Sequence, residues 1–297
     1  MSDIVGSVIL FIGQEARTWG IQELVAAAKF ARSVGVDSIS PKRYDGTIKW
    51  TNDIVAEYRA VTSEGCGYIP FQYAYGPRFG DAQIKAEAAL LVEIGDEIGK
   101  ARGGRGFVCT DLEAEWDGNT QAGNLFAHAL QYIQSDLYVT TWANPNSHGW
   151  KGILQALKPV THAFVPQQYT DYLATRSTDF AGYTIQPALD LSQEFGANHP
   201  VTIAQQAGDA SVWLWEYGFA QKNPNLVRQI VSTVKGSAPA PTSTSVGGVY
   251  QVKWGENLTV IANRYSTTWQ QLWSMNRSVI ADPNKIYAGQ WIRVPSK

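Results

Sequence analysis

Hydrophobic positions follow two alternating patterns over the first 235 residues. Short apolar runs, typical of buried strands, alternate with stretches in which apolar residues recur every three or four positions, as on one face of a helix. The clearest helical stretches lie at 21–34, 84–98 and 226–234. The eight predicted strands are Val8–Ile12, Asp37–Ser40, Tyr68–Tyr73, Gly106–Glu113, Leu137–Trp142, His162–Tyr169, Val201–Gln206 and Val212–Tyr217. Strands that alternate with helices predict a parallel sheet.

Eight such units in about 235 residues have the size of a (β/α)8 barrel. A doubly wound open sheet is the alternative, and it would favour a glycine-rich phosphate turn after the first strand. The sequence at that point, FIGQEARTWG, is not such a turn. The predicted fold class is therefore α/β, a TIM-type barrel followed by a small α+β domain.

A change of composition divides the chain. The stretch GSAPAPTSTSVGG, residues 236–248, is small, polar and proline-containing, and it is predicted to be a flexible linker. We therefore expect a barrel domain at 1–235 and a second domain at 249–297. The second domain is predicted to run strand, helix, helix, strand.

Charge and composition limit the classes of binding partner that we expect. The net charge of −2 gives no reason to expect nucleic acid or an anionic membrane, and no apolar stretch is long enough to span a bilayer. The N-terminus lacks a basic region and a small-residue cleavage site, so no classical signal peptide is expected. Cys66 and Cys109 lie in or beside apolar runs and are predicted to be buried free thiols. The four histidines are scattered, so neither a metal nor an organic cofactor is expected.

The fourth predicted strand ends in acids. Asp111 and Glu113 are two residues apart, and alternate residues of a strand point to the same side. Barrel sites lie at the carboxyl ends of the strands, so both side chains are expected at the barrel mouth. When two carboxyls lie close together, the pKa of one of them is raised. Glycosidic cleavage needs a proton donor beside a group that stabilises charge. Structural salt bridges or helix capping are the alternative explanation.

Aromatic residues accompany the predicted strand ends. Their flat faces suit the C–H faces of sugar rings, whose hydroxyls need polar neighbours. Packing in the barrel core is the alternative role for each ring. The candidate substrate-binding aromatics are Tyr73, Tyr75, Trp142, Tyr169 and Trp215. Asp171 and Glu216, beside two of these rings, are candidate catalytic participants.

The order GCGYIPFQYAYG, DAQIKAEAALLVEIGD, VCTDLEAEWDG resembles the family 25 glycoside hydrolases, which are lysozyme-like muramidases. The resemblance implies that Glu113 is the general acid. It also implies that Asp111 orients the N-acetyl group of the substrate and stabilises charge as that group attacks the anomeric carbon. The first strand, however, lacks the family's Asp. The last strand, VWLWEYG, is closer to family 18 chitinase-like proteins.

The segment from Tyr250 to Pro295 resembles the LysM module over its whole length, through Tyr-x-Val, Gly-Glu-Asn-Leu, Ile-Ala-x-x-Tyr and Asp-Pro-Asn-x-Ile-Tyr-x-Gly-Gln. LysM modules bind N-acetylglucosamine-containing glycans, chiefly peptidoglycan and chitin. The resemblance implies a groove between two loops. Its expected residues are Gly255, Glu256 and Asn257 on one side, and Pro283, Asn284, Ile286 and Tyr287 on the other.

Together these patterns predict a peptidoglycan-degrading glycoside hydrolase anchored to the wall by a LysM module. We expect it to be made in the cytoplasm and to act at the cell wall or outside the cell after release. Two alternatives remain: a chitinase-like hydrolase, and a non-catalytic wall-binding protein of the phage-tail type. The missing first-strand Asp favours the second alternative.

Overall fold

The computed structural model describes most of the chain. The described residues are 6–51, 53–168, 178–192, 200–208, 210–235, 246–253, 256–265, 267, 269–274, 276, 280, 285–287 and 289–295. The chain divides into two compact units, residues 1–238 and 239–297.

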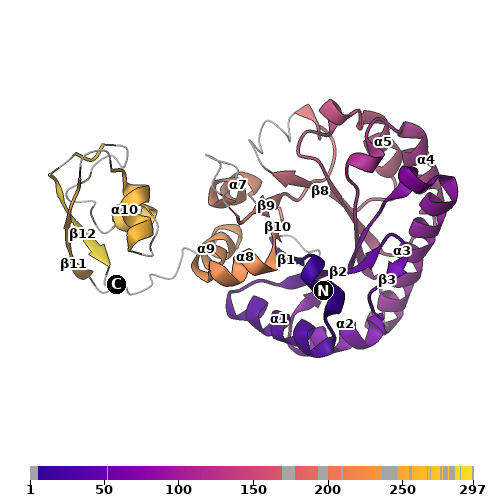
Figure 1. Ribbon diagram of the computed structural model, residues 1–297, viewed down its shortest axis with the longest axis horizontal. Coiled ribbons are helices and arrows are strands. Elements are labelled where there is room, and N and C mark those ends of the chain that lie inside the picture. Colours follow the sequence, from indigo (N-terminus) through magenta and orange to yellow (C-terminus); the bar gives the residue numbers. More distant parts are fainter. Residues whose placement is uncertain are drawn as a thin grey trace. The chain divides into compact units, whose positions relative to one another are not determined.

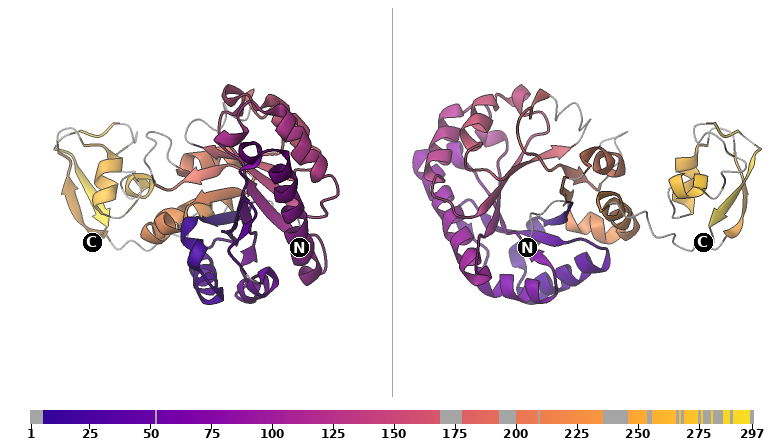
Figure 2. Two further views of the ribbon diagram at one scale, coloured as in Figure 1. Left: turned by 45° about the vertical axis from the view of Figure 1, so that its right-hand side comes forward. Right: turned by 180° about the vertical axis from the view of Figure 1, so that it is seen from behind.

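The first unit is a closed parallel barrel. β1 pairs in parallel with both β2 and β10, so the sheet has no free edge between its first and last strands. In Figures 1 and 2 the strands form a central ring with the helices outside it. Its strands are β1 (Val8–Ile12), β2 (Ser38–Asp45), β4 (Gly67–Tyr68) continued by β5 (Phe71–Tyr73), β6 (Phe107–Asp111), β7 (Asp136–Thr141), β8 (Ala163–Gln168), β9 (Ala188–Asp190) and β10 (Val212–Trp215). The predicted TIM-type barrel is confirmed.

Helices cover the outside of the barrel. They are α1 (Ile21–Ser33), α2 (Ile54–Ser63), α3 (Asp81–Arg102), α4 (Thr120–Ala129), α5 (Lys151–Leu157), α7 (Pro200–Ala207), α8 (Tyr217–Lys222) and α9 (Pro224–Val234). Short 3-10 helices follow several strands: η1 (Gln14–Thr18), η2 (Gly76–Phe79), η3 (Ala114–Trp116) and η4 (Pro145–His148). A two-residue strand, β3 (Ile48–Lys49), turns back antiparallel on the end of β2. Among the described residues, none of the helices combines the length and the apolar character needed to cross a bilayer.

β1 is apolar on both faces because both of its faces are covered. In β1, Ile9 and Phe11 belong to the cluster inside the barrel, whereas Val8, Leu10 and Ile12 pack under the helices. All five residues are buried, which explains why the run VILFI shows no polar alternation.

One glycine contact sets the distance between α3 and β6. A Cβ on Gly106, just before β6, would overlap the backbone oxygen of Gly95 in α3. Only glycine at position 106 lets the helix lie this close to the strand. The contact helps to place the start of β6, the strand that carries Asp111 at its other end.

The predicted seventh strand was wrong. Residues 201–206 lie in α7, and β9 is the strand between β8 and β10. The buried residues of α7, among them Val201, Ile203, Ala204 and Ala207, fall at helical spacing. β9 is only three residues long and follows Pro187, so the run of apolar residues that could mark it in the sequence is short. The predicted third strand is also interrupted, since Ile69 and Pro70 separate β4 from β5.

The second unit has the predicted strand–helix–helix–strand order. β11 (Val246–Gln251) pairs antiparallel with β12 (Trp291–Pro295), and α10 (Leu258–Arg264) and α11 (Trp269–Ser274) lie between them in sequence. β11 begins within the last residues of the stretch predicted to be a linker. The small core is built from both strands and both helices, and its buried members include Val252, Leu258, Ile261, Leu272 and Ile292.

Candidate active site at the barrel mouth

Asp111 is the last residue of β6 and is almost completely buried, with 4% of its surface exposed. Its Oδ1 accepts a hydrogen bond from the hydroxyl of Thr140, its neighbour in register on β7. Burial, and then the nearby Glu113 carboxylate, raise the pKa of Asp111 to about 7, against the Thr140 hydrogen bond and the Lys42 charge, which lower it. This carboxyl can therefore carry a proton near neutral pH.

Glu113 follows β6 and is half-buried. Its Oε1 accepts a hydrogen bond of 3.3 Å from Nε2 of Gln167, on β8. Its Oε2 lies 3.4 Å from the hydroxyl of Tyr73, on β5. Contacts from two other strands thus hold a carboxyl that remains partly open to solvent.

Glu115 lies in η3, just after β6, and belongs to the same cluster. Its Oε2 accepts a hydrogen bond of 3.0 Å from the hydroxyl of Tyr73, and its Oε1 lies 3.9 Å from Nη1 of Arg78. Burial, followed by the charge of Glu113 and the hydrogen bond to Glu115, raises the pKa of Tyr73. Tyr73 is therefore a neutral phenol that donates its one proton to this pair of carboxylates.

Lys42, on β2, is a member of this region that sequence reasoning missed. Its side chain is 4% exposed and its Nζ lies 2.8 Å from Oδ1 of Asp45. The same ammonium lies 4.9 Å from the ring centre of Tyr73 and 5.0 Å from that of Trp50. In sequence it is one charge within the polar stretch SPKRYD. No local signal indicates that it faces the acids.

Tyr75 extends the aromatic side of the cluster. Its ring centre lies 4.9 Å from that of Tyr73, and its hydroxyl donates a 3.2 Å hydrogen bond to Asp45. The buried carboxylate of Glu87, from α3, accepts hydrogen bonds from the backbone N–H groups of Tyr75 and Gly76, at 3.0 and 2.9 Å. These contacts fix the loop after β5. They therefore hold the two tyrosines in place.

Trp142, after β7, has one face already covered. Its indole stacks on the His148 imidazole, with ring centres 4.7 Å apart and planes at 16°. Asp117 accepts hydrogen bonds from the indole N–H groups of Trp142 and Trp150, at 3.0 and 2.7 Å, and lies 3.0 Å from Nδ1 of His148. Burial opposes ionisation of Asp117, but the hydrogen bonds from Trp150, His148 and Trp142 outweigh it and hold its pKa below the usual range.

A second pair of acids lies where β1 and β10 end. Oε2 of Glu216 and Oε2 of Glu15 lie 3.0 and 3.5 Å from the point where a Cβ on Gly13 would be. Burial, and then the charge of Glu15, raise the pKa of Glu216. Trp215 precedes Glu216 and packs edge-on against Phe11 of the interior, with ring centres 5.1 Å apart. The two groups of acids come from different strands of the ring, β6 in one case and β1 and β10 in the other.

Tyr169, Asp171, Gly255, Pro283 and Asn284, all predicted site residues, lie outside the described residues. In the second unit, Glu256 accepts hydrogen bonds from the Tyr250 hydroxyl and the Lys253 N–H, each at 2.9 Å, and pairs with Arg264. Asn257 caps α10 by accepting a 2.9 Å hydrogen bond from Val260 N–H. These side chains thus have roles inside the domain, and their part in binding remains a prediction.

Ile286 and Tyr287 have different surroundings. Ile286 packs against the core of the second unit, whereas Tyr287 is 66% exposed. The groove expected between the two loops stays a prediction.

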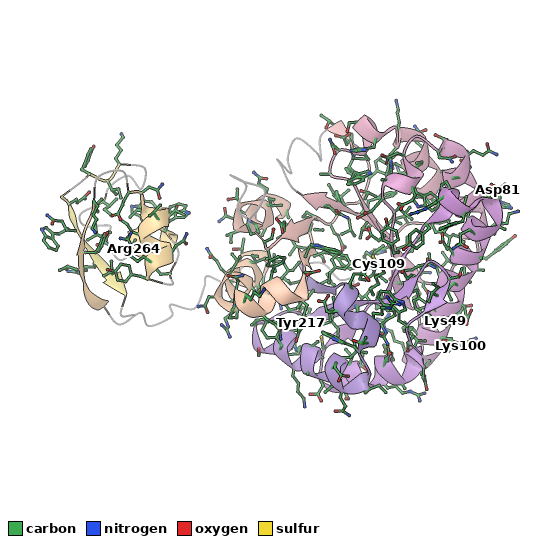
Figure 3. The ribbon with its side chains drawn as sticks, viewed as in Figure 1. Lys49, Asp81, Lys100, Cys109, Tyr217 and Arg264 are labelled. Atoms are coloured by element: carbon green, nitrogen blue, oxygen red, sulfur yellow. The ribbon has the colours of Figure 1, made fainter. Side chains whose placement is uncertain are left out.

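Cys66 and Cys109 are free and buried, as predicted. Burial raises the pKa of the Cys66 thiol to about 12. Cys109 lies inside the barrel, near its centre in Figure 3, and burial raises its pKa as well. Among the described residues, no three histidine, cysteine, aspartate or glutamate side chains are grouped so that they could hold a metal ion.

Comparison with known proteins gives relatives that match part of the chain. "N-acetylmuramoyl-L-alanine amidase sle1" of Staphylococcus epidermidis is 39% identical over 67 residues, which is 23% of this chain and 20% of the amidase. "Endolysin" of Bacillus phage B103 is 35% identical over 92 residues, which is 31% of this chain and 33% of that protein. The chain therefore matches a third or less of each relative's length, and neither match is long enough to span the barrel.

Among solved structures, the catalytic domain of a hyperthermophilic chitinase from Pyrococcus furiosus is 12% identical, with a TM-score of 0.48 over 78% of this chain and 96% of the chitinase domain. The resemblance to the LysM module is confirmed at the level of the family: residues 250–295 match the LysM domain model, and this region of the chain is a LysM domain.

Proposed function

We propose that this protein is a glycoside hydrolase of the cell wall, in which the barrel cleaves peptidoglycan glycan strands and the LysM domain holds the wall. The observation that carries the proposal is the pair of carboxyls at the end of β6. Asp111 is buried with its pKa raised to about 7, and Glu113, two residues on, is partly open to solvent. A proton-holding group beside a second carboxyl is the arrangement that glycosidic cleavage uses.

In the proposed reaction, the two carboxyls share one proton. Asp111 passes it to Glu113 when substrate binds, and Glu113 gives it to the glycosidic oxygen as the bond from that oxygen to the anomeric carbon breaks. The carbonyl oxygen of the substrate's own N-acetyl group bonds to the same carbon. Ionised Asp111 accepts a hydrogen bond from the N-acetyl N–H and stabilises the positive charge that develops. Water then attacks the anomeric carbon, the bond from that carbon to the N-acetyl oxygen breaks, and the attacking water gives a proton to Glu113. This route is the one implied by the resemblance to family 25 glycoside hydrolases.

The contacts of Glu113 support its role. Tyr73 and Gln167 reach its two oxygens from β5 and β8, so the carboxyl has a defined orientation before substrate binds. Tyr75 and Trp142 lie after β5 and β7 and offer partly exposed aromatic surface for sugar rings. Because Trp142 already stacks on His148, the opposite face is the one that a sugar would cover.

The LysM domain supports the proposal that the substrate is part of the cell wall. Modules of this kind bind N-acetylglucosamine-containing glycans, and the two curated relatives are named as an amidase and an endolysin. A single tethered module raises the local concentration of substrate at the barrel without adding a contact there. We therefore place the site of action at the cell wall.

The test compares the wild type with Glu113→Gln and with Glu64→Gln, in which the changed acid pairs with Lys29 on the outer helices. Purified sacculi are followed by turbidity, by released reducing ends and by protein pull-down. We expect clearing by the wild type and Glu64→Gln, and a rate about 10³-fold lower for Glu113→Gln, because a general acid typically contributes 10²- to 10⁴-fold. All three proteins should sediment with the walls.

A non-catalytic wall-binding protein is the second candidate, because the family match covers the LysM region and β1 carries no acid within the strand. Pull-down by the wild type without any release of reducing ends would favour it. Soluble chito-oligosaccharides released from chitin, without clearing of sacculi, would instead identify a chitinase-like hydrolase.

A further inference from the structure

A pocket of about 420 Å³ opens on the outer side of the barrel, away from the acids at the mouth. It is formed by the β2–β3 hairpin, the first half of α2 and the last turns of α3. In Figure 3, Lys49 and Lys100, which both line it, lie at the outer flank of the barrel, whereas Cys109 lies at the centre. The residues that matter for its chemistry are Tyr44, Lys49, Asp53, Arg59, Glu97 and Lys100.

Tyr44 provides a buried donor in this pocket. The residue is 3% exposed and lines the pocket, and its hydroxyl takes part in none of the hydrogen bonds among the described residues. Burial, and then the charges of Glu57, Glu97 and Glu93, raise its pKa, so the phenol stays neutral. A ligand oxygen in the pocket can therefore accept a hydrogen bond from this hydroxyl.

The charged groups around the pocket carry both signs. Arg59 and Lys100 are exposed, and no carboxylate among the described residues lies within ion-pair distance of either. Glu97 is likewise exposed and makes no ion pair within that part of the chain. Lys49 differs, because its ammonium lies 2.9 Å from Glu93. Two unpaired cations and at least one unpaired acid therefore surround one cavity.

Charges of both signs favour a zwitterion over a simple anion. A phosphate would be attracted by Arg59 and Lys100 but repelled by Glu97 and Asp53. A ligand with a carboxylate and an ammonium group satisfies both sets, and its carboxylate also suits the guanidinium of Arg59. Ile54, Val55 and Ala101 supply apolar surface for short side chains between the charges.

We propose that this pocket binds a short zwitterionic peptide, of the kind that branches from the glycan strands of the cell wall. The source of the peptide rests on the proposed function, whereas the zwitterionic chemistry rests on the pocket alone. Arg59 and Lys100 hold the carboxylate, Glu97 holds the ammonium group, and the Tyr44 hydroxyl donates to a carbonyl or carboxylate oxygen. Because this pocket lies outside the cleavage site, it would let the protein bind the peptides of the wall as well as the sugars.

The test is calorimetric titration of the full chain with the synthetic tetrapeptide L-Ala-γ-D-Glu-L-Lys-D-Ala, in the Glu113→Gln background so that cleavage plays no part. We expect binding that weakens at least tenfold with Arg59→Gln and severalfold with Tyr44→Phe. The matched control is Lys85→Gln, an exposed lysine of α3 that does not line the pocket, and it should bind as before. Melting temperatures should be unchanged, because Arg59 is exposed and the Tyr44 hydroxyl has no partner to lose.

The requirement for charges on the peptide is tested with the same peptide acetylated at its amino groups and amidated at its carboxylates. This blocked peptide should not bind. The proposal is overturned if the blocked peptide binds equally well, if Arg59→Gln binds like the wild type, or if no heat is released at millimolar peptide. It is also overturned if inorganic phosphate displaces the peptide and binds more tightly. Cleavage of sacculi is measured separately, so a failure here is distinguishable from a failure of the hydrolase proposal.

Discussion

The hydroxyl of Tyr73 donates a hydrogen bond of 3.0 Å to Oε2 of Glu115. Oε2 of Glu113 lies 3.4 Å from the same hydroxyl. A phenol has one proton, so Tyr73 can serve only one of the two carboxylates at a time. The Tyr73 hydroxyl therefore cannot donate to Glu113 and Glu115 at the same time. Removal of this hydroxyl should affect the chemistry more than the fold.

Tyr73→Phe is expected to slow the release of reducing ends from sacculi by about 10- to 100-fold, because a hydrogen bond to a charged group contributes about 1.5–3 kcal/mol. Tyr132→Phe, which alters a tyrosine that is 76% exposed, is the matched control and should have no effect. Equal rates for Tyr73→Phe and the wild type would show that the hydroxyl plays no part in the reaction.

The buried carboxyl of Asp111 should make stability depend on pH. Its pKa in the folded chain is about 7, above the value of about 3.9 for an unfolded aspartate. The folded state therefore binds this proton more tightly. The stability that this bound proton contributes to the folded state is fully present below about pH 4 and is lost as the pH rises through 7. The loss is on the order of 4 kcal/mol.

Asp111→Asn cannot titrate, so its melting temperature should fall less than that of the wild type between pH 4 and pH 8. Thermal melts at a series of pH values measure this difference. Asp81→Asn, at an exposed acid that begins α3, should follow the wild-type curve. Parallel curves for Asp111→Asn and the wild type would mean that the Asp111 carboxyl titrates normally.

Arg43 and Glu57 form a buried ion pair between β2 and α2, with Nη2 and Oε1 2.5 Å apart and side chains 1% and 5% exposed. Glu57 also accepts a hydrogen bond from Tyr68, and Arg43 donates to the backbone oxygens of Ala16 and Trp50. Arg43→Met should lower the free energy of unfolding by about 3–5 kcal/mol, because it leaves a buried carboxylate without its cation.

The double variant Arg43→Met/Glu57→Leu should lose less than the sum of the two single losses, as measured by urea denaturation. Additive losses would argue that the two charges do not interact in the folded protein. Lys49→Met, which breaks an exposed pair with Glu93, should change stability by less than about 1 kcal/mol.

Gly76, in the loop after β5, has a φ of +41°, and a Cβ there would overlap the buried indole of Trp116. Gly76→Ala is therefore expected to destabilise the protein by about 2 kcal/mol or more and to reduce activity through Tyr73 and Tyr75. Gly104→Ala is the control, because no atom lies within 4 Å of its Cβ position. Thermal melts and reducing-end assays on both variants measure the difference.

Apart from the strand predicted at 201–206, the alternating patterns of the sequence were sufficient for the barrel, because the spacing of apolar residues is a local property of the sequence. A run such as VILFI is buried on both faces wherever it lies in the ring, and the spacing of apolar residues in α9 requires a covered helix face. The same alternation predicted Asp111 and Glu113 on one side of a strand, whereas β6 ends at Asp111 and Glu113 lies in the residues that follow it. The LysM domain was recognisable because its motif positions lie within 46 consecutive residues.

Tertiary structure decided the properties that depend on neighbours distant in sequence. Burial in the closed barrel, and then the charge of Glu113, raise the pKa of Asp111 to about 7, whereas Thr140 and Lys42 lower it. Glu15 comes close to Glu216 only because β1 pairs with β10. The outer pocket joins Tyr44 of β2 to Lys100 of α3, and no local pattern connects them. Burial and charge act through space, so they are known only when the ring has closed.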